Sequence, residues 1–149
     1  MMISVARWLA FSAMIAVSVI PAGGAAAAVP VQITDSCGTV RATTDNSQGL
    51  RGGTVQATVC RRADGSAYFH IAYNNYVEDH QADGVAARAW VNTPGGIYGP
   101  IGVDSTSTPG GTSISWNSSN NFNSYVNVWV CLGTQSPTNA SPTCAYGTF

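Results

Sequence analysis

Residues 54–70 read TVQATVCRRADGSAYFH, and this stretch decides the fold. Apolar and polar side chains alternate through its first half, where Val55, Ala57 and Val59 share one face. An alternation of period two is typical of a β-strand that buries one of its faces. The stretch therefore predicts a half-buried strand that ends near Arg61.

The second half of the same stretch predicts a hairpin. Asp64-Gly65 is a strong two-residue turn signal, and a second apolar alternation follows it over residues 68–77. The two segments therefore form neighbouring antiparallel strands. On the second strand the alternation places three side chains inside, namely Phe69, Ile71 and Tyr73.

Other segments repeat the pattern, with Gly, Pro, Asn and Ser clusters between them. They span residues 31–34, 39–43, 85–91, 97–103, 112–116 and 125–131. About eight short strands without a helical period predict an all-β fold, an antiparallel sandwich or a small barrel. The tail, residues 133–149, is rich in Pro and Thr and is expected to be irregular.

The first 28 residues have the pattern of an export signal. Arg7 precedes an apolar run at residues 8–20, and Ala26-Ala27-Ala28 is an A-x-A cleavage site. A membrane-spanning helix needs about 20 apolar residues, more than this run provides. We therefore expect residues 29–149 to form a single exported domain, extracellular or associated with the cell envelope.

Charge and composition narrow the range of partners. The chain has six Lys plus Arg and seven Asp plus Glu, and without Arg7 the exported part carries five cations against seven anions, a net charge of −2. It has no basic stripe for phosphate contacts, so we expect no nucleic-acid partner. It also has no basic amphipathic helix, so we expect no membrane partner. We expect the domain to be a monomer. The Lys-free, Ala/Gly/Thr-rich composition is similar to that of exported bacterial proteins.

The cysteines Cys37, Cys60, Cys131 and Cys144 predict two disulfides, because an even number in an exported chain is usually oxidised. Three connectivities are open, and nearest-neighbour pairing closes one local loop with each bond. Each bond would stabilise the fold by roughly 3 kcal/mol. No Cys or His spacing matches a metal site, so we expect neither a metal nor another cofactor.

Glu78, Asp79, His80 and Asp83 form the densest ionisable cluster. Carboxylates on a loop suit a hard cation such as Ca²⁺. Their spacing matches no known ligand pattern, however, and we interpret the cluster as a solvated hairpin tip that closes at Asp83.

A second group consists of His70, the YNNY segment at residues 73–76, Glu78 and Arg88. It resembles the His…Tyr-Asn-Asn-Tyr-Glu segment of the small secreted guanyl-specific ribonucleases. The resemblance implies that the Tyr/Asn part receives the base while His70, Glu78 and Arg88 perform phosphodiester transfer. It covers about ten residues, with altered spacing and no His after Arg88, so a ribonuclease-like phosphodiesterase is kept as the enzyme alternative.

Aromatic side chains on faces expected to be polar form the third group. If the valines of residues 126–130 and the apolar residues of 85–91 face the core, their neighbours face outward. A one-residue slip of the register would instead turn the tryptophans inward. The candidate ligand-binding residues are Tyr68, His70, Arg88, Trp90, Tyr125 and Trp129.

These observations favour a secreted binding domain without catalytic residues. Its surface aromatics would bind a glycan of the cell wall or a secreted or surface protein. A small inhibitor of a secreted hydrolase, presenting a loop fixed by a disulfide, is the second alternative.

Overall fold

The computed structural model describes residues 35–121, 124–138 and 141–149, which belong to one compact unit, Gln32–Phe149. The expected export signal and the expected strand at residues 31–34 lie outside the described residues. The described part contains nine strands and no helix. The all-β prediction is therefore confirmed.

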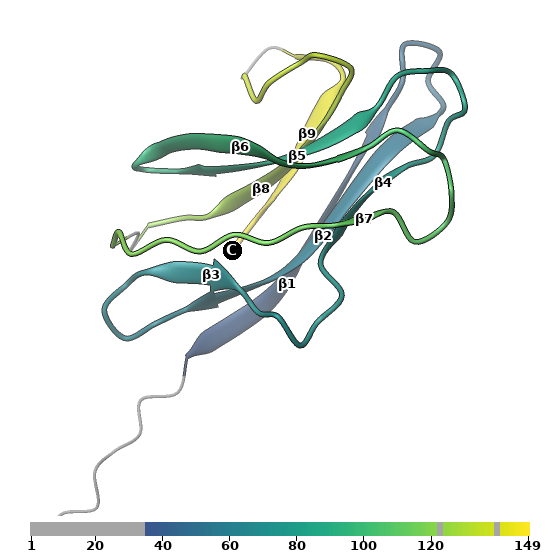
Figure 1. The fold of residues 1–149 in the computed structure, drawn as a ribbon. Coiled ribbons are helices and arrows are strands. Elements are labelled where there is room, and N and C mark those ends of the chain that lie inside the picture. Colours follow the sequence, from purple (N-terminus) through teal and green to yellow (C-terminus); the bar gives the residue numbers. More distant parts are fainter. Residues whose placement is uncertain (1–34, 122–123, 139–140) are drawn as a thin grey trace, which may run out of the picture. The chain divides into compact units, whose positions relative to one another are not determined.

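The strands form two antiparallel sheets (Figure 1). In sheet A the order is β1-β2-β4-β7, and β3 also pairs with β2. In sheet B the order is β6-β5-β8-β9. The strands of sheet A are β1 (Ser36–Asp45), β2 (Arg51–Arg61), β3 (Ala67–Phe69), β4 (Tyr76–Asp79) and β7 (Thr112–Ser113). The strands of sheet B are β5 (Ala87–Thr93), β6 (Gly96–Asp104), β8 (Asn127–Leu132) and β9 (Cys144–Thr148).

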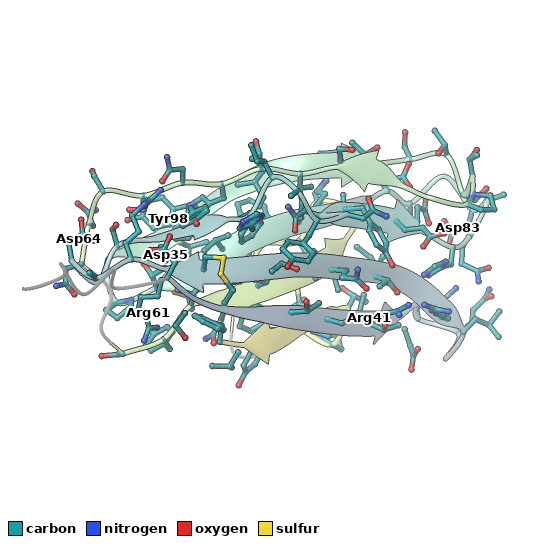
Figure 2. All side chains as sticks on the ribbon, turned by 90° about the horizontal axis from the view of Figure 1, so that it is seen from below. Asp35, Arg41, Arg61, Asp64, Asp83 and Tyr98 are labelled. Atoms are coloured by element: carbon teal, nitrogen blue, oxygen red, sulfur yellow. A yellow bond between two sulfur atoms is a disulfide. The ribbon has the colours of Figure 1, made fainter. Side chains whose placement is uncertain are left out.

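The core lies between the two sheets, which pack as a sandwich: β1 and β2 contact β8, and β4 contacts β5 and β6. Fully buried valines from both sheets dominate it, among them Val55, Val77, Val91 and Val128. The layers approach closely at Gly147, where an added Cβ would lie 2.5 Å from Val40 Cγ1. Asp64 and Asp83 lie at opposite ends of the sandwich (Figure 2).

Both disulfides join neighbouring strands of one sheet. Cys37 and Cys60 are directly opposite on β1 and β2, and Cys131 and Cys144 are directly opposite on β8 and β9. Nearest-neighbour pairing is therefore confirmed. The cysteines alternate along their strands with residues that face the core, so both bonds lie on the outer faces of the sheets. They therefore fix the strand register and do not tie the two sheets together.

The expected strand at residues 68–77 is broken, and the prediction that Ile71 and Tyr73 are inside is wrong. β3 ends at Phe69 and β4 begins at Tyr76, although both pair with β2. Ile71 is 92% exposed and Tyr73 is 57% exposed. Residues 70–75 leave the sheet because the side chain of Asn75 accepts a hydrogen bond from Thr58 N (2.8 Å), in place of a backbone carbonyl.

Two other expectations are also corrected. The tail is not irregular throughout, because β9 pairs along β8 in the register that places Cys144 opposite Cys131. β5 begins at Ala87, and Val85 is 39% exposed because it belongs to the turn that follows Asp83.

Candidate binding surfaces

The six candidate residues divide between the two outer faces of the sandwich. Alternation with the buried Ala87, Ala89, Val128 and Val130 places Arg88, Trp90 and Trp129 on the outer face of sheet B. Tyr125 precedes β8 by two residues and is half-buried. Tyr68 belongs to the other sheet, and His70 follows directly after β3. The structure therefore offers two separate surfaces, not one site.

An aromatic row crosses the outer face of sheet B. Trp90 lies opposite Trp129, and Trp129 lies opposite Tyr146. The Trp129 and Tyr146 rings are stacked, with centroids 4.3 Å apart and planes 29° apart. Tyr146 is the most exposed of the three, at 54%. Sequence reasoning missed Tyr146 because it treated the tail as irregular. The expected disulfide of Cys144 was the one signal that this segment is held in place.

Trp129 points outward and is nevertheless only 6% exposed. No slip of register is involved, since its neighbours Val128 and Val130 face the core. The stacked Tyr146 covers it. Trp90 is half-buried and packs closely over Gly99, where an added Cβ would lie 3.0 Å from its Cε3. The row is therefore a rigid layer in which Trp129 supports Tyr146.

The two indoles of this row carry unused donors. Nε1 of Trp90 and Nε1 of Trp129 are buried and have no hydrogen-bond partner within the described structure. A buried donor without an acceptor costs about 1–3 kcal/mol.

Hydrogen-bonding groups flank the aromatic row. Asn92 lies opposite Asn127, which lies opposite Thr148, and Thr148 Oγ1 donates to Asn127 Oδ1 (2.8 Å). On the other side Arg88 Nε donates to the carbonyl of Gly133. We call this surface the aromatic face, defined by Arg88, Trp90, Asn92, Asn127, Trp129, Tyr146 and Thr148.

The second surface is the segment His70–Asn75, which we call the knob. It leaves sheet A after β3 and returns at β4 (Figure 1). The His70 and Tyr73 rings lie 4.9 Å apart, edge to face. Beside the knob, Tyr68 donates its hydroxyl to Asp35 Oδ2 (2.7 Å), which raises the pKa of Tyr68, and its ring contacts the guanidinium of Arg62.

The ribonuclease-like group is not assembled. Glu78 alternates with the buried Val77 and Asp79, so it lies on the outer face of sheet A, where His70 is also found. Arg88 lies on the outer face of sheet B, and the core separates it from both. No single phosphate can contact all three side chains.

The acidic cluster is only partly a solvated tip. Asp83 and Gly84 are exposed, but Asp79 is 2% exposed and Asp104, from β6, is 1% exposed. Asp104 Oδ2 accepts the backbone N–H of Asp79 (2.9 Å), and Asp79 Oδ1 accepts that of Gln81 (3.0 Å). In the described ranges no three His, Cys, Asp or Glu side chains come together as a metal site would require.

Burial shifts the pKa values of Asp79 and His80 at this end of the sandwich. Desolvation raises the pKa of Asp79 above 3.8, and the charges of Asp83 and Asp104 add to the rise. Desolvation also lowers the pKa of His80 below 6.5, and Arg51 adds to that effect. His80 Nε2 shares a hydrogen bond with Thr54 Oγ1 (2.9 Å).

Asp79→Asn is expected to raise the melting temperature at pH 7 by a few degrees. Since the pKa of Asp79 is higher in the folded than in the unfolded chain, its contribution to stability is complete below 3.8 and is lost as the pH rises through the folded value. An amide keeps the acceptor for Gln81 N and never ionises. Melting curves at pH 7 and at about pH 3 test this, with exposed Asp45→Asn as the control. Equal melting of the variant and the wild type at pH 7 would contradict it.

No family model matches the chain, and searches of curated proteins and of solved structures found no match. The described residues contain no helix that is long and apolar enough to cross a membrane.

Proposed function

We propose that this protein is an exported, non-catalytic binding domain that attaches to a neutral glycan through the aromatic face. The observation that carries the proposal is the cross-strand row of Trp90, Trp129 and Tyr146, with Asn92 and Asn127 beside it. Aromatic rings stack on the apolar faces of sugar rings, and amides and hydroxyls bond the sugar hydroxyls.

The rigidity of the face favours binding. Each aromatic side chain stands on a strand of a four-stranded sheet, and the Cys131–Cys144 bond fixes the register of the last two strands. A surface that is ordered before binding loses little conformational entropy on contact with its ligand.

The charge of the face favours a neutral ligand. Among the outward-facing residues of β5, β8 and β9, Arg88 is the only charged one, and it already bonds the Gly133 carbonyl. A basic polymer would therefore find no anion on these strands and an acidic polymer a single cation, whereas a neutral glycan needs neither.

The proposal includes export of the domain and the absence of a catalytic site. Two disulfides support an oxidising compartment, and the export pattern of residues 1–28 agrees with it. The separation of Arg88 from His70 and Glu78 removes the support for phosphodiester transfer.

Tyr146→Ala is expected to weaken glycan binding at least fivefold. The probe is an array of neutral oligosaccharides from chitin and cellulose, followed by titration of the best ligand with the exported chain. Tyr146 provides the most exposed ring of the row, so its loss removes stacking area and uncovers Trp129. Because the change uncovers Trp129, the melting temperature of the variant is measured as well, to confirm that the domain remains folded.

Tyr73→Ala is the matched control, because Tyr73 is 57% exposed against 54% for Tyr146 and lies on the other sheet. It should bind the glycan like the wild type. Absence of binding to every glycan of the array, or equal loss in both variants, would reject the aromatic face as a glycan site.

A further inference from the structure

We propose that the knob is a docking element for a folded protein partner, with Ile71 inserting into an apolar pocket of that partner. This inference is independent of the glycan proposal, since the knob belongs to sheet A and the aromatic face to sheet B. It rests on the joint observation of a rigid turn and an almost fully exposed large apolar side chain at its tip.

The knob is held rigid by hydrogen bonds at both of its ends. His70 N donates to Thr58 O (2.9 Å), and Asn75 Nδ2 donates to His70 O (2.9 Å). Asn75 is 7% exposed, and its side chain also accepts the Thr58 N–H, so one buried amide joins the ends of the knob to β2. A preorganised loop retains most of its binding energy, because little freedom remains to be lost.

The tip of the knob is apolar where a solvated turn would be polar. Ile71 is 92% exposed, and the adjacent Ala72 is also exposed. Turn positions are usually occupied by Gly, Pro, Asn, Asp or Ser, whose backbone preferences or side-chain hydrogen bonds suit them. Ile71 makes no such contribution to the turn, and its exposed side chain is available for contact with another molecule.

Hollows on both sides of Ile71 complete the surface. One, of 420 Å³, is lined by Tyr68, Trp116 and Asn117, and the other, of 190 Å³, is lined by Tyr73 and Ser113; Ile71 borders both. A partner whose pocket received Ile71 could place its rim in these hollows. Aromatic groups around one inserted anchor are typical of the centre of a protein interface.

The convex shape indicates the class of the partner. Small ligands bind in concave sites, whereas a protruding side chain needs a concave partner, which a folded protein provides. The knob contains no Asp, Glu, Lys or Arg, so the partner's pocket should be apolar and uncharged. A membrane is disfavoured because surface-binding segments combine several large apolar groups with basic residues, and the knob, which exposes Ile71 and Tyr73, contains no Lys or Arg.

The backbone of the tip excludes one form of the inhibitor hypothesis. Tyr73 N donates to His70 O (3.2 Å), which closes a turn over Ile71 and Ala72. A segment that enters a hydrolase cleft as a substrate does must be extended. The partner therefore receives the Ile71 side chain and not the knob's main chain.

The test replaces the exposed Ala72 with a photoreactive phenylalanine derivative in the exported chain, so that Ile71 stays in place beside the label. The labelled protein is irradiated with the secreted and surface proteins of the producing cells, and the cross-linked protein is then purified. We expect one cross-linked protein, displaced by excess unlabelled wild type and not by Ile71→Ser. Ile71→Ala should weaken the affinity of the purified partner at least tenfold, while Tyr146→Ala, on the other sheet, changes it by less than twofold.

Equal melting of Ile71→Ser and the wild type confirms that the variants are folded, as 92% exposure of Ile71 implies. The proposal is overturned if Ile71→Ser competes as well as the wild type, or if no protein cross-links. Flotation of the wild type, but not of Ile71→Ser, with neutral or anionic phospholipid vesicles would assign the knob to a membrane and likewise overturn it.

Discussion

Replacing Cys37 and Cys60 together by Ser is expected to lower the melting temperature by roughly 10 °C or more, since about 3 kcal/mol of stability is lost. The bond spans 23 residues, which include the turn between β1 and β2. Without it the unfolded chain gains conformational freedom, while the folded chain keeps the backbone pairing of β1 with β2. Far-UV circular dichroism at low temperature should therefore still show a β-sheet.

The Cys131→Ser and Cys144→Ser pair is the matched comparison, because it removes the same chemistry from a loop of 13 residues. A shorter loop restricts the unfolded chain less, so this pair should cost slightly less than the first. Thermal melts of both double variants provide the measurement. A Cys37/Cys60 variant that melts within two degrees of the wild type would show that this bond does not stabilise the domain.

Much of the fold could be predicted because one face of each long strand is buried. In β2 the alternation of Val55, Ala57 and Val59 with polar residues fixes both the strand and its inner face. In β8 the same rule gives the outward direction of Trp129. The disulfide pairing followed from loop length, and it agrees with the register of the strands.

The knob and β9 could not be predicted by the same rule. Alternation continues from Phe69 through Ile71 to Tyr73, so the pattern gives no sign that the chain leaves the sheet. What interrupts the strand is a single amide, since Asn75 reaches Thr58 across the gap. In β9 the inner positions hold Ala145 and Gly147, which are too small to give an apolar period.

The candidate site residues also divide into those that the strand pattern locates and those that it does not. On the regular strands, alternation indicates the face of Arg88 and Trp90, but the sequence leaves open a register slip that would turn the tryptophans inward. Tyr146 and the exposed state of Ile71 depended on tertiary contacts that a local pattern does not contain.

Asn75→Ala is expected to destabilise the domain by about 3 kcal/mol. The variant leaves the buried Thr58 N–H without an acceptor, which costs about 1–3 kcal/mol. It also removes the Asn75 donor from the His70 carbonyl, which keeps Tyr73 N as a donor, and this lost hydrogen bond costs about 1 kcal/mol. Chemical denaturation gives the free energy of unfolding. Hydrogen exchange of the Thr58 amide reports the local effect, and it should accelerate because this amide loses its only bond to the knob.

Asn74→Ala is the matched control, since Asn74 is the adjacent residue of the same type, is exposed, and contributes its backbone carbonyl to Gln56 Nε2. It should change stability by less than about 0.5 kcal/mol, as surface substitutions usually do. Equal stability of the two variants would show that the Asn75 amide does not hold the knob. A large difference would mean that one buried side chain both interrupts the strand and orders the turn at whose tip Ile71 is exposed, so that the break in sheet A and the proposed docking element have the same physical origin.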